Sequence, residues 1–400
     1  MKTNHIILKG LFACLSFLAL FTPTTFAQKV PGTIVAFKES SSKSYVGSPS
    51  LCVLPNGSYL ASHDFFGKQT SENQSIIYRS DNKGKTWKQI AQLQQFWSEL
   101  FVHNNAVYFI GPIKANGDFV IRKSTDGGYT WTNPTDEQNG LILKGKYHCA
   151  PTPVVAHQGR LWRALEDSST PKKWPTLYKT MVISIPTDAN LLEAKNWTAT
   201  NRLEHDSTAL NQQFLGWLEG NIVIGPNKEV LNVLRVHTLD QHKEYAAIAH
   251  VSADGKNITF NPQQNFINMP GGSKKFTIKY DQKSGKYWSL VNYVPAPYQG
   301  IMQLDRIRNT LALVSSSNLK DWTINHIVLQ HEDYKHHGFQ YINWLIDGND
   351  IIALSRTAFN DGVSGAADYH NSNYMTLHHI KKFRKLKQTS ILYTNLTSDK

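Results

Sequence analysis

The sequence feature that most constrains the fold is a β-hairpin that recurs along the chain. Each copy is a short apolar stretch, a polar turn rich in Gly and Asn, and a second short apolar stretch. Six copies span residues 50–67, 100–111, 153–167, 221–236, 275–293 and 341–357. Gly and Asn supply the positive φ angles that tight hairpin turns require. A recurring unit of this kind predicts a repeat architecture rather than two unrelated domains.

A second motif, the Asp box, follows most of the hairpins. In its pattern, Ser-x-Asp-x-Gly-x-Thr-Trp, the carboxylate accepts backbone N–H groups, Gly takes the left-handed position and Trp packs into the sheet. The copies are SDNKGKTW (80–87) and STDGGYTW (124–131), with weaker versions in SADGKNITF (252–260) and SSSNLKDW (315–322). Hairpins and Asp boxes together supply four strands per repeat. Radial repetition of four-stranded sheets predicts an all-β fold, a β-propeller.

The number of blades and the closure of the ring also follow from the repeats. Six blades are countable from the hairpins, and residues 201–220 hold either a further blade or an inserted loop. We expect residues 33–37 to pair with residues 374–380, so that the first strand closes the ring with the last.

The two ends of the chain differ from the repeats. Residues 1–27 have a basic start, an apolar run too short to span a bilayer and small residues at the end, which predicts a secretory signal peptide. Residues 28–384 are expected to form one propeller domain, and residues 385–400 a basic, polar tail. The protein is therefore predicted to be exported, to the periplasm or the extracellular space, without a membrane span.

Charge and cysteine content narrow the partners. The formal net charge is +12, which suits nucleic acid or an acidic polymer. The sequence holds no nucleic-acid motif, so we expect an acidic plant or algal polysaccharide or oligosaccharide and no nucleic acid. Cys52 and Cys149 are too few for a disulfide scaffold and are expected to be buried thiols. No Cys/His cluster has metal-site spacing, so neither a metal nor a cofactor is expected.

Strand order predicts where a site lies. The hairpin turns and Asp boxes mark one end of the ring. In each hairpin the first strand begins, and the second strand ends, at the opposite end of the ring. Polar and aromatic residues recur at this opposite end. They are His63, Trp97, Tyr147, His148, Trp217, Glu219, Arg235, Lys275, Asn292, His337, Gln340 and Arg356. Taken singly, each has a structural explanation, such as a strand-end histidine or a scaffold ion pair. Their recurrence predicts a shared, cation-rich cup.

Cations in a cup favour a substrate with a carboxylate, such as a sialic or uronic acid. Hydrolysis of such a sugar usually needs two carboxyl groups beside the glycosidic bond. β-Elimination at a uronate instead needs a base near neutral pKa and positive groups that stabilise the developing charge. The candidate residues are richer in His, Arg and Lys than in facing carboxylates, which favours elimination. Hydrolysis and non-catalytic glycan binding remain the alternatives.

The Asp boxes and the blade order resemble those of the sialidase-like β-propeller superfamily over the whole mature chain. A sialidase needs an arginine triad and a Tyr–Glu nucleophile pair. The usual N-terminal Arg-Ile-Pro segment is missing, because that position reads VGSPSLCVLPNG (46–57). Arg235, Arg308 and Arg356 could still mimic the triad.

A closer resemblance is carried by SPSLCVLPNGSYLASHDFFG, KYHCAPTPVV, WLEGN, GGSKKFTIKYD, KHHGFQYINWL and IIALSRTAFNDG. These segments resemble the bacterial propeller family of L-rhamnosyl-α-1,4-D-glucuronate lyases and rhamnosidases, which act on the caps of arabinogalactan. The resemblance implies seven blades rather than the six visible in the sequence. It also implies a histidine as acid or base, with Arg and Tyr as helpers.

The resemblance assigns roles to the residues of the cup. The catalytic candidates are His63, His148, Tyr147, Arg235 and Arg356. The candidates for binding the substrate are Lys275, Asn292, Gln340, His337, Glu219, Trp97 and Trp217, of which the two tryptophans would stack on a sugar ring.

Overall fold

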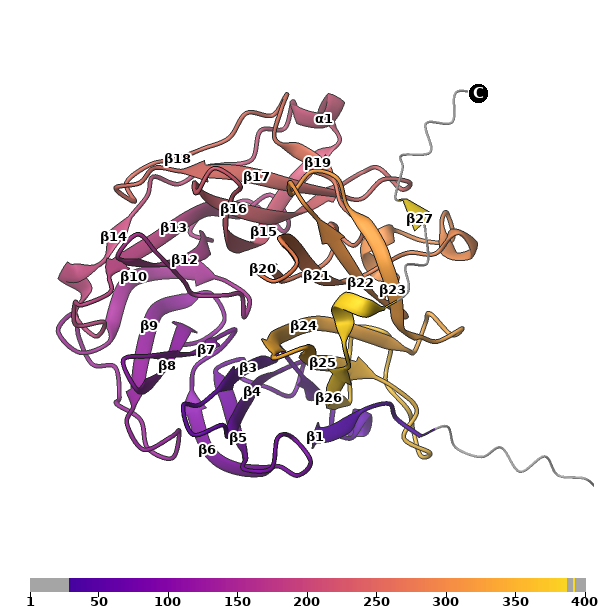
Figure 1. Ribbon diagram of the computed structural model, residues 1–400, viewed down its shortest axis with the longest axis horizontal. Helices are drawn as coiled ribbons and strands as arrows, with labels where there is room; N and C mark the ends of the chain where they lie inside the picture. The colour runs from indigo at the N-terminus through magenta and orange to yellow at the C-terminus, as the bar shows by residue number, and fades with distance from the viewer. Residues whose placement is uncertain (1–28, 387–390, 393–400) are drawn as a thin grey trace, which may run out of the picture.

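The computed structural model describes residues 29–386 and 391–392. Its antiparallel sheets stand in a ring around a central axis, so the predicted all-β propeller is confirmed (Figure 1). The predicted signal peptide and most of the predicted tail lie outside the described residues. Within the described part, no helix is long and apolar enough to cross a membrane.

Four of the five sheets are separate blades of four or five strands. The first blade contains β2 (Tyr45–Val46), β3 (Ser50–Val53), β4 (Tyr59–Phe66), β5 (Gln74–Ser80) and β6 (Lys88–Gln94). Another contains β15 (Phe214–Ile224), β16 (Val230–Thr238), β17 (Tyr245–Val251), β18 (Ile258–Thr259) and β19 (Phe266–Asn268). The next contains β20 (Ile278–Asp281), β21 (Lys286–Asn292), β22 (Thr310–Ser316), β23 (Thr323–Gln330) and β27 (Ile391–Leu392). The last contains β24 (Gly338–Asp347), β25 (Asp350–Ala358), β26 (Tyr374–Ile380) and β1 (Thr33–Phe37).

The fifth sheet has eight strands and divides into two four-stranded units. One unit contains β7 (Glu99–His103), β8 (Ala106–Pro112), β9 (Gly117–Ser124) and β10 (Leu141–His148). The other contains β11 (Val155–His157), β12 (Arg160–Asp167), β13 (Lys179–Pro186) and β14 (Thr198–Ala199). The units join where β10 pairs with β12, at Tyr147–Asp167 and His148–Glu166.

The expectation of seven blades is wrong. The four separate blades and the two units of the eight-stranded sheet use every strand in the described residues. The stretch that was a candidate for a further blade, residues 201–220, holds the short α1 (Ala209–Gln212) and the start of β15. It is therefore an inserted loop. The remaining helices are short 3₁₀ turns, η1 (Ser40–Ser42), η2 (Ala194–Asn196), η3 (Ala296–Tyr298), η4 (Leu304–Arg306) and η5 (Phe383–Lys385).

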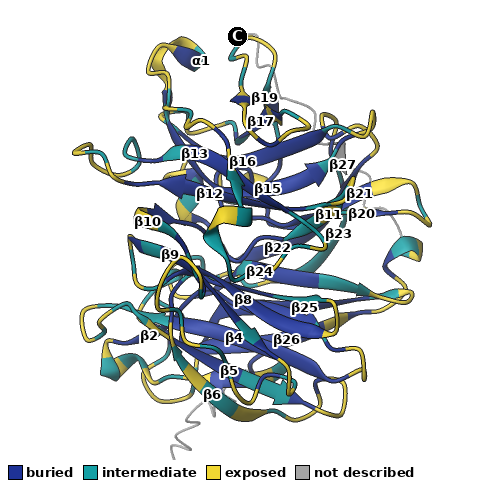
Figure 2. Ribbon diagram, turned by 90° about the vertical axis from the view of Figure 1, so that its left-hand side faces the viewer, coloured by how far each residue is buried: buried dark blue, intermediate teal, exposed yellow. Residues whose placement is uncertain are grey.

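The core lies between neighbouring blades, where buried strand faces meet and the loops remain exposed (Figure 2). The predicted closure of the ring is confirmed, because β1 pairs with β26 from Thr33–Leu377 to Phe37–Tyr374. Burial of Val35 and Ala36 against the first and last blades holds this strand in place. Both cysteines are buried and free, as predicted.

The Asp boxes form the turns that the sequence predicts. Asp126 accepts hydrogen bonds from the backbone N–H groups of Tyr129 and Thr130, at 3.0 Å each. The indole of Trp131 donates back to the carbonyl of Gly128 at 2.8 Å. In the first copy Asn82 fills the aspartate position, because its side-chain oxygen accepts the N–H of Thr86 at 2.9 Å. These turns fix one end of each blade and leave the other end for a site.

Candidate active site

A cavity of about 370 Å³ opens at the end of the ring opposite to the Asp boxes. Its direction follows from strand pairing, because Asp64 on β4 lies opposite Ser75 at the start of β5, whereas the first Asp box follows the end of β5. Side chains from β4, β10, β15, β16, β24 and β25 line it. The predicted cup therefore exists, at the predicted end of the ring.

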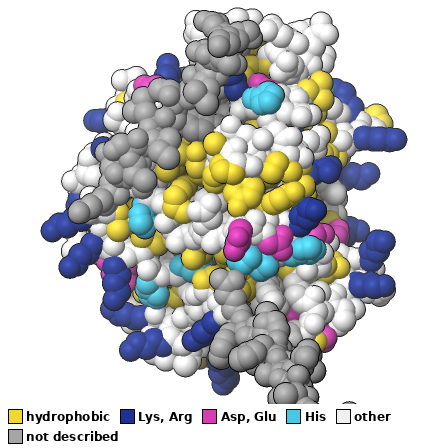
Figure 3. Space-filling model, turned by 90° about the vertical axis from the view of Figure 1, so that its right-hand side faces the viewer, with side chains coloured by type: hydrophobic (Ala, Val, Ile, Leu, Met, Phe, Trp, Pro, Cys, Tyr) yellow, Lys and Arg dark blue, Asp and Glu magenta, His cyan; other side chains and the backbone are white. Residues whose placement is uncertain are grey.

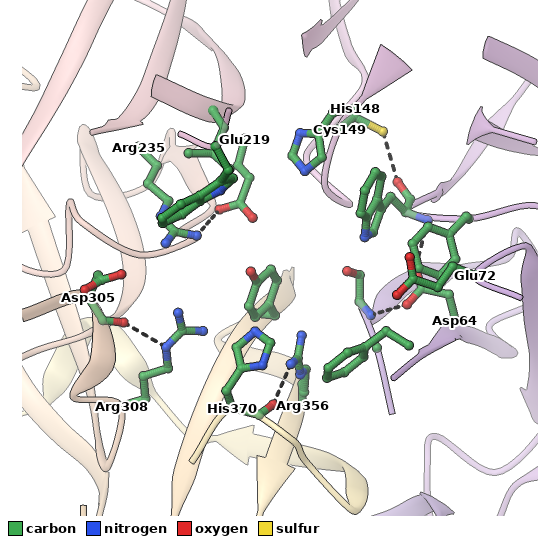
Figure 4. A pocket seen from close by; sticks show the side chains of 18 of the residues that line it. Asp64, Glu72, His148, Cys149, Glu219, Arg235, Asp305, Arg308, Arg356 and His370 are labelled. Atoms are coloured by element: carbon green, nitrogen blue, oxygen red, sulfur yellow. Dashed lines mark hydrogen bonds and ion pairs between the residues drawn. The ribbon is translucent and has the colours of Figure 1, made fainter. Parts of the chain in front are cut away.

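Four arginines line this cavity, and Figure 4 labels three of them, Arg235, Arg308 and Arg356. Arg235 donates from Nη1 to Glu219 at 2.9 Å and from Nε to the carbonyl of Ser273 at 2.8 Å. Arg308 donates from Nε to the carbonyl of Asp305 at 3.0 Å. Arg356 donates from Nη2 to the carbonyl of His370.

Each guanidinium keeps N–H groups available. Among the described residues no hydrogen-bond partner is found for Nη2 of Arg235, Nη2 of Arg308 or Nη1 of Arg356, and Nε of Arg356 is buried and unpaired. Burial, together with the neighbouring Arg308, lowers the pKa of Arg356 to about 10, so it still carries a charge at neutral pH. Three buried cations with unused donors form a site for a carboxylate.

Asp64 lies across the cavity from Arg235 and Arg308 (Figure 4). Its oxygens accept the backbone N–H groups of Ser48, at 2.8 Å, and Trp97, at 2.7 Å. Burial raises the pKa of Asp64 to about 6, although these two hydrogen bonds act in the opposite direction. A carboxyl group with this pKa holds a proton in mildly acidic solution and can donate it to a leaving oxygen. A Cβ at position 47 would lie 1.6 Å from Oδ1 of Asp64, so only glycine at this position leaves room for the carboxyl group.

Glu219 is a second carboxyl group in the cavity, and it is ionised. Burial would raise its pKa, but Arg235, followed by His148 and Arg308, outweighs that effect and holds the pKa below its usual value. The cavity thus contains two carboxyl groups in opposite states, Asp64 protonated up to about pH 6 and Glu219 deprotonated. Such a pair separates the roles of acid and base.

Three residues that line the cavity have backbone angles uncommon for residues other than glycine. Trp97, Glu219 and Tyr341 have φ of 49°, 58° and 53°. The last two lie in bulges, since pairing shifts register between Leu218 and Asn221 and between Gln340 and Asn343. A bulge re-aims a side chain, and strain of this kind gathers at functional sites. Tyr341 lies against Arg356 and Arg308, whose guanidinium carbons are 4.7 and 5.6 Å from the ring centre.

His148 is a third residue of the cavity whose side chain can transfer a proton. Its Nδ1 lies 2.7 Å from Oε2 of Glu166, which is fully buried. Its ring packs between Trp97 and Tyr178, with ring centres 4.4 and 4.5 Å away. This arrangement fixes the ring and leaves Nε2 without a hydrogen-bond partner among the described residues.

The predicted site residues divide into two groups. His148, Arg235, Arg356, Glu219 and Trp97 line the cavity. His63 does not, and neither do Tyr147, Lys275, Asn292, Gln340, His337 and Trp217.

His63 and Tyr147 are each one residue away from a side chain that faces the cavity. Successive side chains on a strand point to opposite faces, so Asp64 and His148 face the cavity and their neighbours do not. His63 packs on Phe65 and Tyr78, and burial lowers its pKa to about 4, so it is neutral. Tyr147 packs on Phe119.

Lys275, Asn292 and Gln340 hold the scaffold. Lys275 donates to Thr277 at 2.9 Å and to the carbonyl of Ile342 at 2.6 Å. Asn292 donates to the carbonyl of Phe339 at 2.7 Å. Gln340 accepts a hydrogen bond from Nη1 of Arg308, so it orients an arginine of the cavity from behind.

His337 and Trp217 are also structural. The ring of His337 stacks on His331, with ring centres 3.5 Å apart. Trp217 is 2% exposed and packs edge-on against Phe214 and Phe260. Neither side chain is available to a ligand in the cavity.

Residues missing from the predicted site lie where the repeat gives no register. Arg308 precedes β22 in a loop, Tyr341 lies in a bulge, and Trp174 and Tyr178 lie in or beside the β12–β13 loop. Asp64 was adjacent to the predicted His63, and the alternation along β4 could have placed either one inward.

The comparisons with known proteins bear on the fold. No family model matches the chain, and the search of curated proteins finds no match. Among solved structures, the chain is similar to an α-L-arabinanase from Penicillium chrysogenum complexed with arabinobiose, at 16% identity and a TM-score of 0.55, covering 89% of this chain and 99% of that one.

Two sialidases are similar in the same way. A Hadza microbial sialidase is 12% identical with a TM-score of 0.55, covering 88% of this chain and 68% of that one. A Trypanosoma rangeli sialidase in complex with sialic acid is 13% identical with a TM-score of 0.53, covering 88% and 57%. At these identities the likeness concerns the fold, and the chain has a sialidase-like β-propeller fold.

Proposed function

We propose that the protein is a carbohydrate-active enzyme that cleaves the glycosidic bond of a terminal sugar bearing a carboxylate. The observation that carries this proposal is the convergence of Arg235, Arg308 and Arg356 on one cavity, each with unused N–H groups. Arg308 and Arg356 have no carboxylate partner among the described residues, and Arg235, which pairs with Glu219, still keeps Nη2 unused. Buried guanidinium groups with unused donors select an anionic ligand. One cavity of about 370 Å³ suits a single sugar unit at a chain end.

Hydrolysis is the reaction that this geometry favours. Tyr341 stands beside Arg356 and Arg308, whose guanidinium groups place positive charge next to its ring. In the first step the tyrosine oxygen bonds to the anomeric carbon, its proton passes to Glu219, and the leaving oxygen takes the proton of Asp64. In the second step water replaces the tyrosine, Asp64 takes a proton from the water, and Glu219 returns its proton to the tyrosine. Some glycosidases, the sialidases among them, use a tyrosine nucleophile.

The neighbouring structures are consistent with hydrolysis. The similar proteins include two sialidases, one of them bound to sialic acid, and an arabinanase bound to arabinobiose. Sialic acid carries the carboxylate that three arginines would hold. A terminal sialic or uronic acid is therefore the proposed substrate class.

β-Elimination at a 4-linked glucuronate, such as the rhamnosyl-glucuronate cap of arabinogalactan, is the second candidate. His148 favours it, because Oε2 of Glu166 at 2.7 Å from Nδ1 orients the ring and leaves Nε2 without a hydrogen-bond partner among the described residues. As base, His148 would take the C5 proton, the bond from C4 to the leaving oxygen would break, and Asp64 would protonate that oxygen. The arginines would neutralise the carboxylate while charge develops.

One experiment separates these reactions. The purified protein is incubated with sialyllactose and, separately, with gum arabic. Free acidic sugar without new ultraviolet absorbance supports hydrolysis, and absorbance of an unsaturated uronate with gum arabic supports elimination. Binding without either product would make the protein a glycan-binding propeller and contradict both reactions.

The proposed partner and location follow from the same chemistry. An acidic plant or algal glycan fits the arginines of the cavity and the net positive charge. Such polymers lie outside the cell, so we propose an exported protein.

A further inference from the structure

A second hollow adjoins the active-site cavity. Its volume is about 60 Å³, and its walls come from the β12–β13 loop, the end of β16 and the loop that precedes β22. It shares Trp174 and Asp305 with the main cavity, so the two spaces are neighbours on the same face of the ring. The proposed reaction leaves this hollow unused.

Trp174 is placed differently from the tryptophans of the core. It is 56% exposed, whereas Trp162, Trp217 and Trp344 are 1%, 2% and 0% exposed. Its ring meets His237 edge-on, with ring centres 4.6 Å apart and an angle of 72° between the planes. An exposed indole held by an edge contact offers a flat apolar face beside the cavity.

His237 is the polar counterpart. It is 6% exposed, lines the hollow, and its Nε2 is buried without a hydrogen-bond partner in the described residues. Its Nδ1 lies 4.0 Å from Asp305. Burial, followed by Arg235 and Arg308, lowers its pKa well below the usual value, so the ring is neutral. A buried polar atom without a partner is costly unless a ligand or water satisfies it.

The rest of the wall combines one proline and three leucines with polar side chains, and it contains no arginine. Thr238, Asp240, Gln241 and Lys243 surround the hollow. A flat aromatic face together with hydroxyl, carboxylate and amide groups is the chemistry that binds a neutral pyranose, through its apolar ring face and its hydroxyls.

We propose that the exposed face of Trp174 and the adjoining hollow together form a second sugar subsite, which binds the neutral sugar on the leaving-group side of the cleaved bond. The hollow, at about 60 Å³, takes one edge of that sugar, and the rest of the ring lies on Trp174. Trp174 stacks on that sugar, and Nε2 of His237 pairs with one of its hydroxyls. This inference rests on the proposed function, because the main cavity must hold the carboxylate-bearing unit for the next sugar to reach Trp174. The protein is then selective for a sugar linked to a further sugar over the same sugar linked to a small alcohol.

The test compares two substrates on the Trp174→Ala variant. Sialyllactose has a sugar for the hollow, and methyl α-sialoside has none. For sialyllactose we expect kcat/KM to fall about tenfold through KM, which corresponds to ~1.4 kcal/mol. Because Trp174 also lines the main cavity, methyl α-sialoside should lose some activity too, but clearly less than sialyllactose does. Trp174→Phe should recover most of the loss with sialyllactose. Tyr129→Ala, which removes a 48% exposed aromatic at an Asp box, is the matched control and should change neither substrate.

Three outcomes would overturn the subsite. The first is an equal loss on both substrates in Trp174→Ala, which would place Trp174 in the main cavity alone. The second is no loss on either substrate. The third is a loss of the same size in the control variant Tyr129→Ala. If the wild-type protein cleaves neither substrate, the proposed hydrolysis fails, and calorimetric titration with lactose alone then decides. Binding that Trp174→Ala abolishes supports the subsite, and absence of binding contradicts it.

Discussion

At the scale of single residues, the site depends on opposite protonation states held by position. Burial raises the pKa of Asp64 to about 6, against the effects of two backbone N–H groups and Arg356, whereas Arg235 holds the pKa of Glu219 below its usual value. Both groups are carboxylates, so the sequence alone does not distinguish them. The difference arises from which strand ends meet in three dimensions.

The raised pKa of Asp64 leads to a prediction about the pH dependence of kcat/KM. Its pKa is raised to about 6, so the protonated acid is present below that pH and is lost as pH rises through it. For the wild-type protein, kcat/KM on the cleaved substrate should therefore fall on the alkaline side with a midpoint near 6. Asp64→Asn should lower kcat/KM by about 10²–10⁴-fold and abolish this limb. An unchanged alkaline limb in Asp64→Asn would show that another group is the acid.

Substitution of His148 should lower kcat/KM to a different extent under hydrolysis and under elimination. Under hydrolysis it is a wall residue, so His148→Gln should lower kcat/KM by no more than about tenfold. Under elimination it is the base, and the loss should be about 10²-fold or more. The control is His63→Gln, which alters a buried histidine outside the cavity and should leave KM unchanged. A change of KM in the control would place His63 back in the site.

At the scale of elements, the repeats were predictable because their turns are coded locally. Gly and Asn set the hairpins, and the Asp-box hydrogen bonds run within a few residues of Asp126. The loops that complete the cavity contain no such local sequence motif. The bulges at Glu219 and Tyr341 depend on packing across blades. Position at a strand end or strand start alone therefore put His63, Tyr147 and Trp217 in the predicted site and left out Tyr341.

The second Asp box yields a prediction about stability. Asp126→Ala removes the acceptor of two backbone N–H groups and should lower the free energy of unfolding by about 1 kcal/mol. Asp126→Asn should cost less, because Asn82 already fills this role in the first box. Burial acts to raise the pKa of Asp126, but hydrogen bonds from Thr130, Ser124 and Tyr129 together outweigh it and lower the pKa to about 2. The advantage of aspartate over asparagine is therefore present above about pH 4 and lost as pH falls toward 2. Chemical denaturation at several pH values measures it, and a larger loss in Asp126→Asn than in Asp126→Ala would contradict this role.

At the scale of the whole molecule, the ring is closed by its own first strand. The sequence was sufficient to predict this closure and the propeller, whereas the number of blades was taken from a family resemblance and was wrong. On the side face shown in Figure 3, Lys and Arg side chains stand mainly along the outline and do not form one continuous stripe. The visible part of that face therefore has no continuous basic track of the kind that binds a nucleic-acid backbone.

Ring closure predicts the effect of removing β1. A chain that begins at residue 38 lacks the pairing with β26 and the buried Val35 and Ala36. Its thermal midpoint should be several degrees below that of a chain that begins at residue 29. Differential scanning calorimetry compares the two, and equal midpoints would show that β1 does not hold the ring closed.

The claim on which the functional proposal depends is that the arginines bind a carboxylate. The most direct measurement compares kcat/KM of the wild-type protein for methyl α-sialoside and for its carboxyl methyl ester, which adds one methyl group and removes the charge. If Arg235, Arg308 and Arg356 hold the carboxylate, the ester should be cleaved about 10²-fold less efficiently or worse, since truncating one partner of a buried charge pair costs 2–5 kcal/mol. Equal cleavage of acid and ester would contradict the claim.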